Sequence, residues 1–321
     1  MTDVDAAPLG TTDAAPGRWP LVSVVLPTRG RPELLRSALA GVLEQTYAGP
    51  IECVIVHDQE EPDRALESLS SPGRRVCVVS NTGAPGLAGA RNCGLTHTSG
   101  DFIASCDDDD RWHATKLARQ MSWLEEHPDY LVVGAGIRLL MPSGPFDWPG
   151  RSATITHADL LLSRYKELHS STLLIRREAF EQAGGYDENL PFSYGEDYEW
   201  LLRVSRVGGV GVVTVPLADI KKDGKSWFRE RQTVVAEALQ YLLEQHPEFR
   251  ESRRGESRLL GQIAFAYATL GQRRLALRWA GRALRRSPMA PHALLAIVMA
   301  ITGLDPRHVL TAARARGRGI S

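Results

Sequence analysis

The sequence predicts an α/β fold: a mostly parallel sheet flanked by helices, followed by an α-helical C-terminal region. Near-continuous apolar runs at residues 21–27 and 51–56 are typical of strands that are covered on both faces. Apolar residues at helical intervals follow the first run, and the two patterns alternate up to about residue 225. This alternation favours parallel strands joined by helices. From about residue 230 only helical patterns remain.

The elements can be assigned in order from the same patterns. Strands are predicted at residues 21–27, 51–56, 75–79, 102–106, 130–136, 171–175 and 210–215. Helices are predicted at residues 31–47, 60–69, 90–98 and 112–126, then from residue 177 and from about residue 195. The glycine-rich residues 83–89 and the Pro/Gly-rich residues 141–150 are predicted to be loops.

The C-terminal region has a pattern of its own. The spacing of apolar and small residues over 258–288 resembles one tetratricopeptide unit, with Ala280 where an aromatic residue is usual. One such unit does not bury its own apolar face. We therefore expect it to pack against the apolar helix at residues 293–301 and against the main domain.

Composition bounds the class of protein. The 321 residues have a formal net charge of zero, yet from residue 250 onward there are fourteen Arg, no Lys and three acids. The arginines alternate with alanines and leucines as on an ordinary helical face, and stacking aromatics are few, which argues against nucleic-acid binding. The four irregularly spaced cysteines indicate free thiols. Residues 1–20 indicate a disordered leader without a signal peptide, and no apolar run reaches the length of a membrane span, so we expect a cytoplasmic protein.

The run Asp107 to Asp110 follows the predicted fourth strand directly. Four adjacent carboxylates repel one another and lose solvation at a strand end. A divalent cation such as Mn²⁺ or Mg²⁺ relieves this repulsion through oxygen ligands, and it can also hold a substrate phosphate. A solvated acidic loop is the alternative reading, but ligands bind at the carboxyl ends of strands in open α/β sheets.

Six short motifs occur in order along residues 21–225: VVLPTR (24–29), VIVHD (54–58), ARNCGL (90–95), GDFI (100–103), DDDDRW (107–112) and GEDYEW (195–200). Together they resemble glycosyltransferase family 2, whose members have the GT-A fold and transfer sugars with inversion. The resemblance implies a GT-A domain at residues 21–229 and a helical region at residues 230–321.

The resemblance also implies roles for individual residues. Asp109 corresponds to the metal ligand, and Asp107 and Asp108 are expected near the ribose or the metal-bound waters. On the donor side, the nucleobase is expected at Pro27 and Thr28, with Arg29 nearby, and at the Asp58 carboxylate, while Arg91 is expected at the diphosphate or the base. Asp197 corresponds to the general base, supported by Glu196.

The sequence departs from the family pattern at two places. His57-Asp58-Gln59-Glu60 replaces the usual paired acids followed by Gly-Ser, which leaves the base open, although a UDP- or dTDP-type donor is favoured. The loop at residues 221–226 lacks the usual His, so Lys222 or Lys225 is a candidate for the diphosphate.

Structural roles compete with each of these functional ones. Thr28 and Asp58 could serve only as turn formers, Arg91 as a surface ion pair, and Glu196 and Asp197 as a helix N-cap pair. Asp110 is expected to cap the helix at residues 112–126.

Two functions remain open from the sequence. The favoured one is a metal-dependent transferase acting on a hydroxyl of a glycan, a lipid-linked acceptor or a small molecule. The alternative is a non-catalytic interaction protein built on a degenerate transferase domain. A peripheral contact of the Arg-rich helices with the inner face of the membrane, or with an acidic partner, is a further hypothesis. The alternative is an Arg-rich surface that only balances the charge of the acidic catalytic domain.

Overall fold

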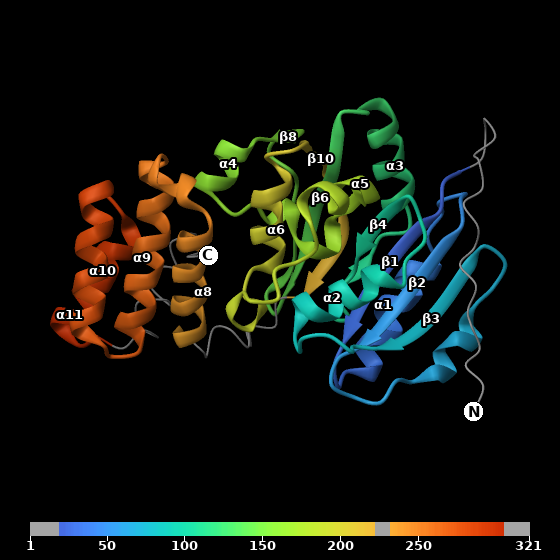
Figure 1. The fold of residues 1–321 in the computed structure, drawn as a ribbon, viewed down its shortest axis with the longest axis horizontal. Coiled ribbons are helices and arrows are strands. Elements are labelled where there is room, and N and C mark those ends of the chain that lie inside the picture. Colours follow the sequence, from blue (N-terminus) through green and yellow to red (C-terminus); the bar gives the residue numbers. More distant parts are fainter. Residues whose placement is uncertain (1–18, 222–231, 305–321) are drawn as a thin grey trace. The chain divides into compact units, whose positions relative to one another are not determined.

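A computed structural model of the chain describes residues 19–221 and 232–304, which divide into two compact units (Figure 1). Of the described residues, the first unit comprises 19–156, 165–187 and 200–221. The second unit comprises residues 157–164, 188–199 and 232–304. The predicted boundary at residues 229/230 lies outside the described residues, and the predicted division into domains stays a prediction.

A ten-stranded sheet forms the centre of the first unit, counted over the described residues. Eight strands follow the order β3-β2-β1-β4-β9-β6-β10-β5, while β7 pairs with β6 and β8 with β10. Their bounds are β1 Val22–Thr28, β2 Ile51–His57, β3 Arg74–Ser80, β4 Phe102–Ser105, β5 Arg111–Trp112, β6 Tyr130–Met141, β7 Gly144–Trp148, β8 Thr154–Ile155, β9 Leu174–Arg176 and β10 Gly209–Lys221. The predicted fold class, a sheet flanked by helices with a helical C-terminal region, is confirmed.

The register brings the carboxyl ends of β1, β2 and β4 together. β1 lies between β2 and β4 and is parallel to both, with Thr28 opposite His57 and Val25 opposite Ser105. Residues that follow these three strands therefore share one edge of the sheet. β9 enters antiparallel to both of its neighbours, β4 and β6, an arrangement that alternating apolar runs do not reveal.

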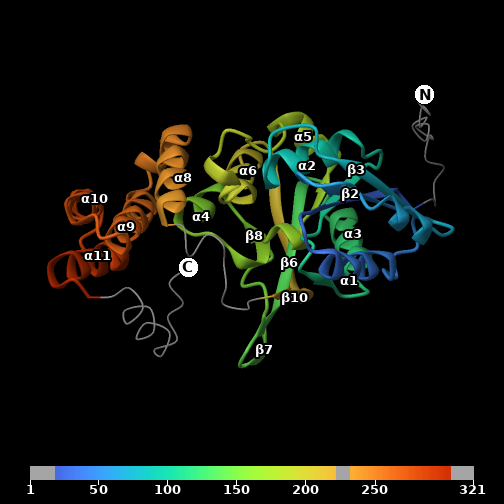
Figure 2. The same cartoon turned by 90° about the horizontal axis from the view of Figure 1, so that it is seen from below.

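Helices cover both faces of this sheet (Figure 2). α1 (Pro32–Leu43) and α3 (Lys116–Glu126) pack on one face, where Leu35, Leu39 and Met121 join the main core. α2 (Leu87–Thr96) packs on the other, and Phe180 of α5 (Arg177–Ala183) packs against the same apolar cluster. Strands β1 and β2 are buried along their whole length, as their continuous apolar runs predict.

Three local predictions are wrong. Residues 141–150 do not form only a loop, because β7 pairs with β6 across a tight turn at Gly144. The strand predicted at 171–175 begins only at Leu174, after the 3₁₀ turns η2 (Lys166–Leu168) and η3 (Ser170–Thr172). The helix predicted at 112–126 begins at Lys116, since Trp112 belongs to β5. The segment at 64–69 is helical as predicted, although it forms a 3₁₀ helix, η1 (Arg64–Leu69).

The second unit is helical. It contains α4 (His157–Leu162), η4 (Pro191–Ser193), α8 (Gln232–Gln245), η5 (Pro247–Arg250), α9 (Arg253–Thr269), α10 (Arg273–Arg286) and α11 (Pro291–Thr302). α6 (Glu196–Val204) begins in this unit, and its residues from 200 onward belong to the first.

Helix α9 packs against α8, α10 and α11, and the predicted contact of residues 258–288 with the following apolar helix is confirmed. Alanines 276, 280 and 283 let α10 approach its neighbours closely. The likeness to a tetratricopeptide unit stays a prediction. Among the described residues, none of the helices combines the length and the apolar character that a bilayer span requires.

Candidate functional site

The acid run leaves β4 at the shared sheet edge, and its first member is held by a buried arginine. Arg91 of α2 donates from Nη2 to Asp107 at 2.6 Å and from Nε to Ser105 at 3.2 Å. Only 1% of Arg91 is exposed, so the surface ion pair considered from the sequence is wrong. Burial would raise the pKa of Asp107, but the charges of Arg91 and His169, together with hydrogen bonds, lower it below its usual value. Arg91 therefore keeps Asp107 ionised.

Asp110 does not cap helix α3, contrary to the prediction. Its carboxylate is buried and accepts hydrogen bonds from Ser171 Oγ at 2.6 Å and from the backbone N–H of Lys221 at 3.3 Å. Burial and the charge of Asp107 raise the pKa of Asp110 well above its ordinary value. Thr115 occupies the N-cap position of α3 instead. The Asp110 side chain therefore points into the sheet edge, where residues distant in the sequence donate hydrogen bonds to it.

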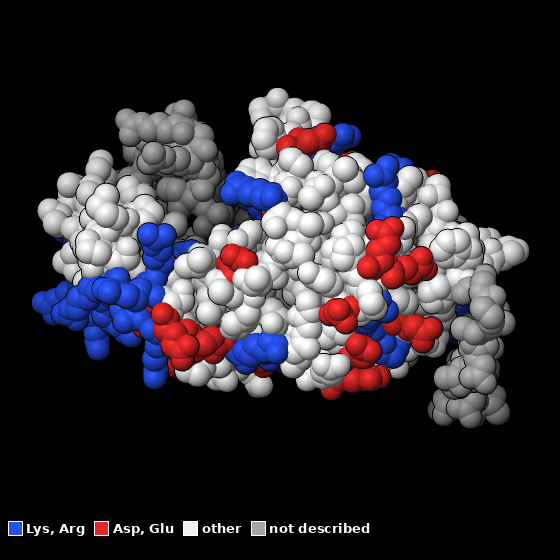
Figure 3. Space-filling view, turned by 90° about the horizontal axis from the view of Figure 1, so that it is seen from above, with Lys and Arg blue, Asp and Glu red and all other residues white. Residues whose placement is uncertain are grey.

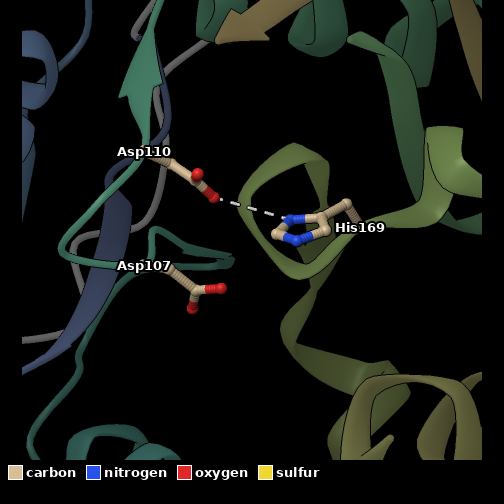
Figure 4. A group of neighbouring side chains, drawn as sticks. All are labelled: Asp107, Asp110 and His169. Atoms are coloured by element: carbon tan, nitrogen blue, oxygen red, sulfur yellow. Dashed lines mark ion pairs between the residues drawn. The ribbon is translucent and has the colours of Figure 1, made fainter. Parts of the chain in front are cut away.

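Asp107, Asp110 and His169 form a cluster with the composition of a cation site (Figure 4). One ligand atom from each lies within 4.8 Å of the others, and His169 Nδ1 lies 3.6 Å from Asp110. His169 directly precedes η3, so its ring approaches from a different segment than the two aspartates. Two carboxylates and an imidazole suit Mn²⁺, whose preferred ligands include oxygen and which accepts a nitrogen ligand. The residues present therefore fit a divalent cation.

Asp108 and Asp109 form a neighbouring cluster with other partners, Thr28 and Arg31. Asp108 is fully buried and accepts from Thr28 Oγ1 at 2.7 Å. Arg31 bridges the two acids, with Nη2 2.5 Å from Asp108 Oδ1 and Nη1 2.9 Å from Asp109 Oδ2. Burial raises the pKa of Asp108 to about 6, although Thr28 and Arg31 oppose the shift. The predicted metal ligand Asp109 is thus 37% exposed and paired with an arginine.

Asp58 follows β2 beside this cluster and organises the glycine-rich loop. Its carboxylate accepts from Asn81 Nδ2 at 2.8 Å and from the backbone N–H of Gly86 at 3.0 Å. Its own N–H donates to the carbonyl of Thr28, so the ends of β1 and β2 are tied together. Pro27 lies buried in β1, whereas Arg29 is exposed just beyond the strand. The structure thus brings the predicted donor-side residues to one edge.

A cavity of about 180 Å³ opens next to Thr28 and His57, on the α1 side of this edge. Glu60, Glu61 and Asp63 line part of it. Arg36 lines it as well and pairs with Asp63 at 2.9 Å, while Glu60 lies 2.8 Å from His57 Nδ1. The lining is thus polar and of mixed charge.

The predicted general base lies in the second unit. Asp197 is buried, and Arg164 Nη2 donates to both of its oxygens, at 2.8 and 3.1 Å. The charge of Asp197 raises the pKa of Arg164. Glu196 is buried beside it at the start of α6. The roles of both acids stay predictions, and Lys222 and Lys225 lie outside the described residues.

Several residues of the site escaped the sequence reasoning: Arg31, Asn81, Arg164, His169, Ser170 and Ser171. Ser170 Oγ donates to Asp107 at 2.9 Å, and the Asp107 N–H donates to Ser171 Oγ at 3.0 Å. The available signal was the polar run from His169 to Thr172 directly before an apolar strand. Arg31 lies two residues after the end of the first motif, close to where the sequence already placed the donor site.

Comparison with known proteins gives a consistent picture. A family model described as Glycosyl transferase family 2 matches residues 23–184. Over 104 residues the sequence is 36% identical to the UDP-Glc:alpha-D-GlcNAc-diphosphoundecaprenol beta-1,3-glucosyltransferase WfgD of Escherichia coli. That match covers 32% of this chain and 41% of the relative, so the chain spans less than two thirds of that enzyme's length.

Solved structures support the same fold at low identity. Residues 1–349 of S. aureus TarS in complex with UDP-GlcNAc superimpose with a TM-score of 0.60 at 14% identity, covering 94% of this chain and 93% of that fragment. The mannosyltransferase PcManGT of Pyrobaculum calidifontis, solved with GDP-Man and Mn²⁺, has a TM-score of 0.57 at 19% identity, covering 96% and 88%.

Proposed function

Because the chain belongs to glycosyl transferase family 2 and has the GT-A fold, we propose that it transfers a sugar with inversion from a UDP- or dTDP-type donor to an acceptor hydroxyl. Transfer from a nucleotide sugar is the family's activity. In the proposed reaction the acceptor oxygen bonds to the anomeric carbon as the bond from that carbon to the diphosphate oxygen breaks. The acceptor proton passes to a carboxylate.

The cluster of Asp107, Asp110 and His169 is the observation that carries the proposal. It stands at the carboxyl edge of β4, the edge at which open α/β sheets bind their ligands. A divalent cation bound there would stabilise the negative charge of the leaving diphosphate. Arg91 and the hydroxyls of Ser170 and Ser171 hold the two carboxylates in place whether or not the ion is bound.

The neighbouring cluster supplies the donor side. The side chain of Arg31 is 45% exposed, so it can reach a diphosphate from this edge. The buried carboxylate of Asp108 holds one side of its guanidinium. Thr28 and Asp58 lie at the ends of β1 and β2, where the nucleobase of the donor is proposed to bind. The UDP sugars named for the matched Escherichia coli enzyme and for the TarS complex support a UDP-type donor.

Asp197 is proposed as the base that takes the acceptor proton, with Glu196 supporting it. A base of this kind must be ionised and oriented before the acceptor arrives. Arg164 meets both needs, because its two contacts fix the carboxylate and favour its charged form. Replacing Asp197 with Asn should lower turnover by about 10²- to 10⁴-fold while donor affinity persists.

The acceptor class is proposed from the relatives alone. The name of the matched Escherichia coli enzyme specifies a sugar linked through a diphosphate to undecaprenol as acceptor. A hydroxyl of a glycan or of a lipid-linked sugar is the corresponding acceptor for this chain.

The test begins with the full chain and a panel of nucleotide sugars. We expect Mn²⁺-dependent release of UDP or dTDP, and calorimetry should show that Mn²⁺ tightens the binding of UDP. Asp110→Asn and His169→Gln should each lose the Mn²⁺-dependent gain in UDP affinity. Asp129→Asn, at an exposed acid away from the site, should keep this gain.

The variant Asp109→Asn separates the two assignments of the metal ligand. Loss of Mn²⁺-dependent binding in Asp109→Asn with retention in His169→Gln would favour the family pattern over the observed cluster. Absence of both Mn²⁺-dependent binding and turnover with every donor would refute the transferase and favour the non-catalytic interaction protein.

A further inference from the structure

Helix α10 presents a row of exposed arginines. Arg274, Arg278 and Arg285 recur at intervals of four and seven residues, so they lie on one face of the helix. Alanines 276, 280 and 283 are buried on the opposite face. Figure 3 shows Lys and Arg side chains gathered over the C-terminal helices, at the left of the view.

Helix α11 presents an exposed apolar row next to it. Leu294, Val298 and Ile301 recur at intervals of four and three residues and are all exposed, Ile301 to 69%. Met289, in the turn between the two helices, is 80% exposed. α10 and α11 pack against each other, and Figures 1 and 2 both show them side by side. Large apolar side chains in this number on one exposed surface indicate an interaction site.

The charge of this surface limits what can cover it. Residues 273–304 contain six arginines and no Asp, Glu or Lys. Of the six, only Arg286 has an ion pair among the described residues, with Glu256 of α9. A second copy of the chain meeting the same surface about a two-fold axis would set arginines against arginines, which disfavours self-association. An anionic bilayer instead offers phosphates to the arginines and an apolar interior to the α11 row.

We propose that the outer surface of α10 and α11, here called the Arg/apolar surface (Arg274, Arg278, Arg285, Met289, Leu294, Val298 and Ile301), docks on an anionic lipid bilayer. The arginines snorkel to the headgroups along their aliphatic stems. The apolar row enters the headgroup boundary, as in helices that lie in the plane of a membrane. The contact is peripheral and reversible.

This inference is independent of the proposed transferase chemistry, because the surface lies in the second unit and shares no residue with the metal cluster or with Asp197. If both hold, the enzyme would work at the membrane where lipid-linked acceptors reside. Loss of lipid binding would leave turnover on a soluble acceptor unchanged, so the two failures can be told apart.

The experiment is co-sedimentation of the full chain with vesicles at low salt. Vesicles of phosphatidylcholine mixed with phosphatidylglycerol should sediment the protein, and vesicles of phosphatidylcholine alone should not. Raising the salt concentration should release it, since exposed charges are screened over about 10 Å at 0.1 M salt.

Two variants test the two halves of the surface. Replacing Arg274, Arg278 and Arg285 with Gln should weaken partitioning about a hundredfold, because each basic residue near an anionic surface contributes about fivefold. The variant Val298→Ser/Ile301→Ser should also weaken it measurably. Both sets of side chains are exposed, so circular dichroism should show unchanged folding.

The matched control replaces three exposed arginines of the first unit, Arg75, Arg119 and Arg206, with Gln. It changes the net charge equally and should sediment like the unaltered chain. The proposal is overturned if the unaltered chain stays in the supernatant with anionic vesicles, or if the control weakens binding as much as the α10 variant. If the unaltered chain does not bind anionic vesicles, an acidic protein becomes the better candidate for a partner of this surface.

Discussion

Lys116, at the start of α3, has its ammonium group in the core of the first unit. The residue is fully buried, and among the described residues Nζ has no hydrogen-bond partner. The group lies 4.0 Å from the centre of the Trp112 ring. Burial lowers the pKa of Lys116 from 10.5 to about 7. We predict that Lys116→Met stabilises the protein.

The magnitude follows from proton linkage. Between about pH 7 and 10.5 the unfolded chain keeps a proton that the folded chain has released, so stability rises with pH in this window. Below pH 7 the folded chain carries the full cost of the buried charge. The interval from 10.5 to about 7, at about 1.4 kcal/mol per pH unit, corresponds to about 5 kcal/mol. Met fills a similar volume, so we expect a gain of about 5 kcal/mol near pH 6 that vanishes near pH 10.5.

Urea unfolding of both proteins across this pH range measures the difference. The matched control is Lys166→Met: the Lys166 ammonium lies 3.9 Å from the Trp148 ring centre, but the residue is only half-buried. The control should show no gain in stability. Equal stability of Lys116→Met and the unaltered chain at about pH 6, or a gain that persists unchanged to about pH 10.5, would refute the linkage argument.

Three further outcomes follow from contacts described above. Gly89→Ala should destabilise the first unit by about 1–3 kcal/mol and weaken donor binding, since the new Cβ would lie 1.8 Å from the Ala84 carbonyl oxygen. Urea unfolding measures the loss of stability, and calorimetry measures the loss of donor affinity. Gly281→Ala, within α10 and with open space around it, should instead stabilise by about 0.5–1 kcal/mol, and destabilisation would show that the space is filled. Arg164→Gln should lower turnover about tenfold to a hundredfold with the donor KM unchanged, because it frees the Asp197 carboxylate; a raised donor KM alone would contradict the positioning role.

The central strands and the sheet edge could be predicted because their signals are local. Continuous apolar runs identify β1 and β2, and the run that starts at Asp107 directly follows β4. Parallel pairing then places Thr28 and Asp58 together without further information. The family motifs added expected roles only where residues match the pattern one by one.

The partners inside the site could not be predicted, because they come from distant segments. The assignment of Asp110 to a helix cap rested on the local preference of acids for helix starts. In the structure, the hydroxyl of Ser171 and the backbone N–H of Lys221 donate to the Asp110 carboxylate instead. These bonds matter because a buried carboxylate without a partner is costly. The role of His169 depends on the antiparallel entry of β9, which no periodicity in the sequence reveals.

The separation of these partners along the chain has a consequence for the order of folding. Arg31 precedes Asp109 by 78 residues, Ser171 follows Asp107 by 64, and Lys221 follows Asp110 by 111. Contacts between such distant residues form slowly, since each requires a long loop to close first. During synthesis the arginines that pair with the acid run, Arg31 and Arg91, emerge before it, whereas the hydrogen-bond donors Ser171 and Lys221 emerge after it. In a nascent chain that stops short of β10, the buried carboxylate of Asp110 therefore lacks the Lys221 N–H, and the polar sheet edge is complete only when this last strand docks.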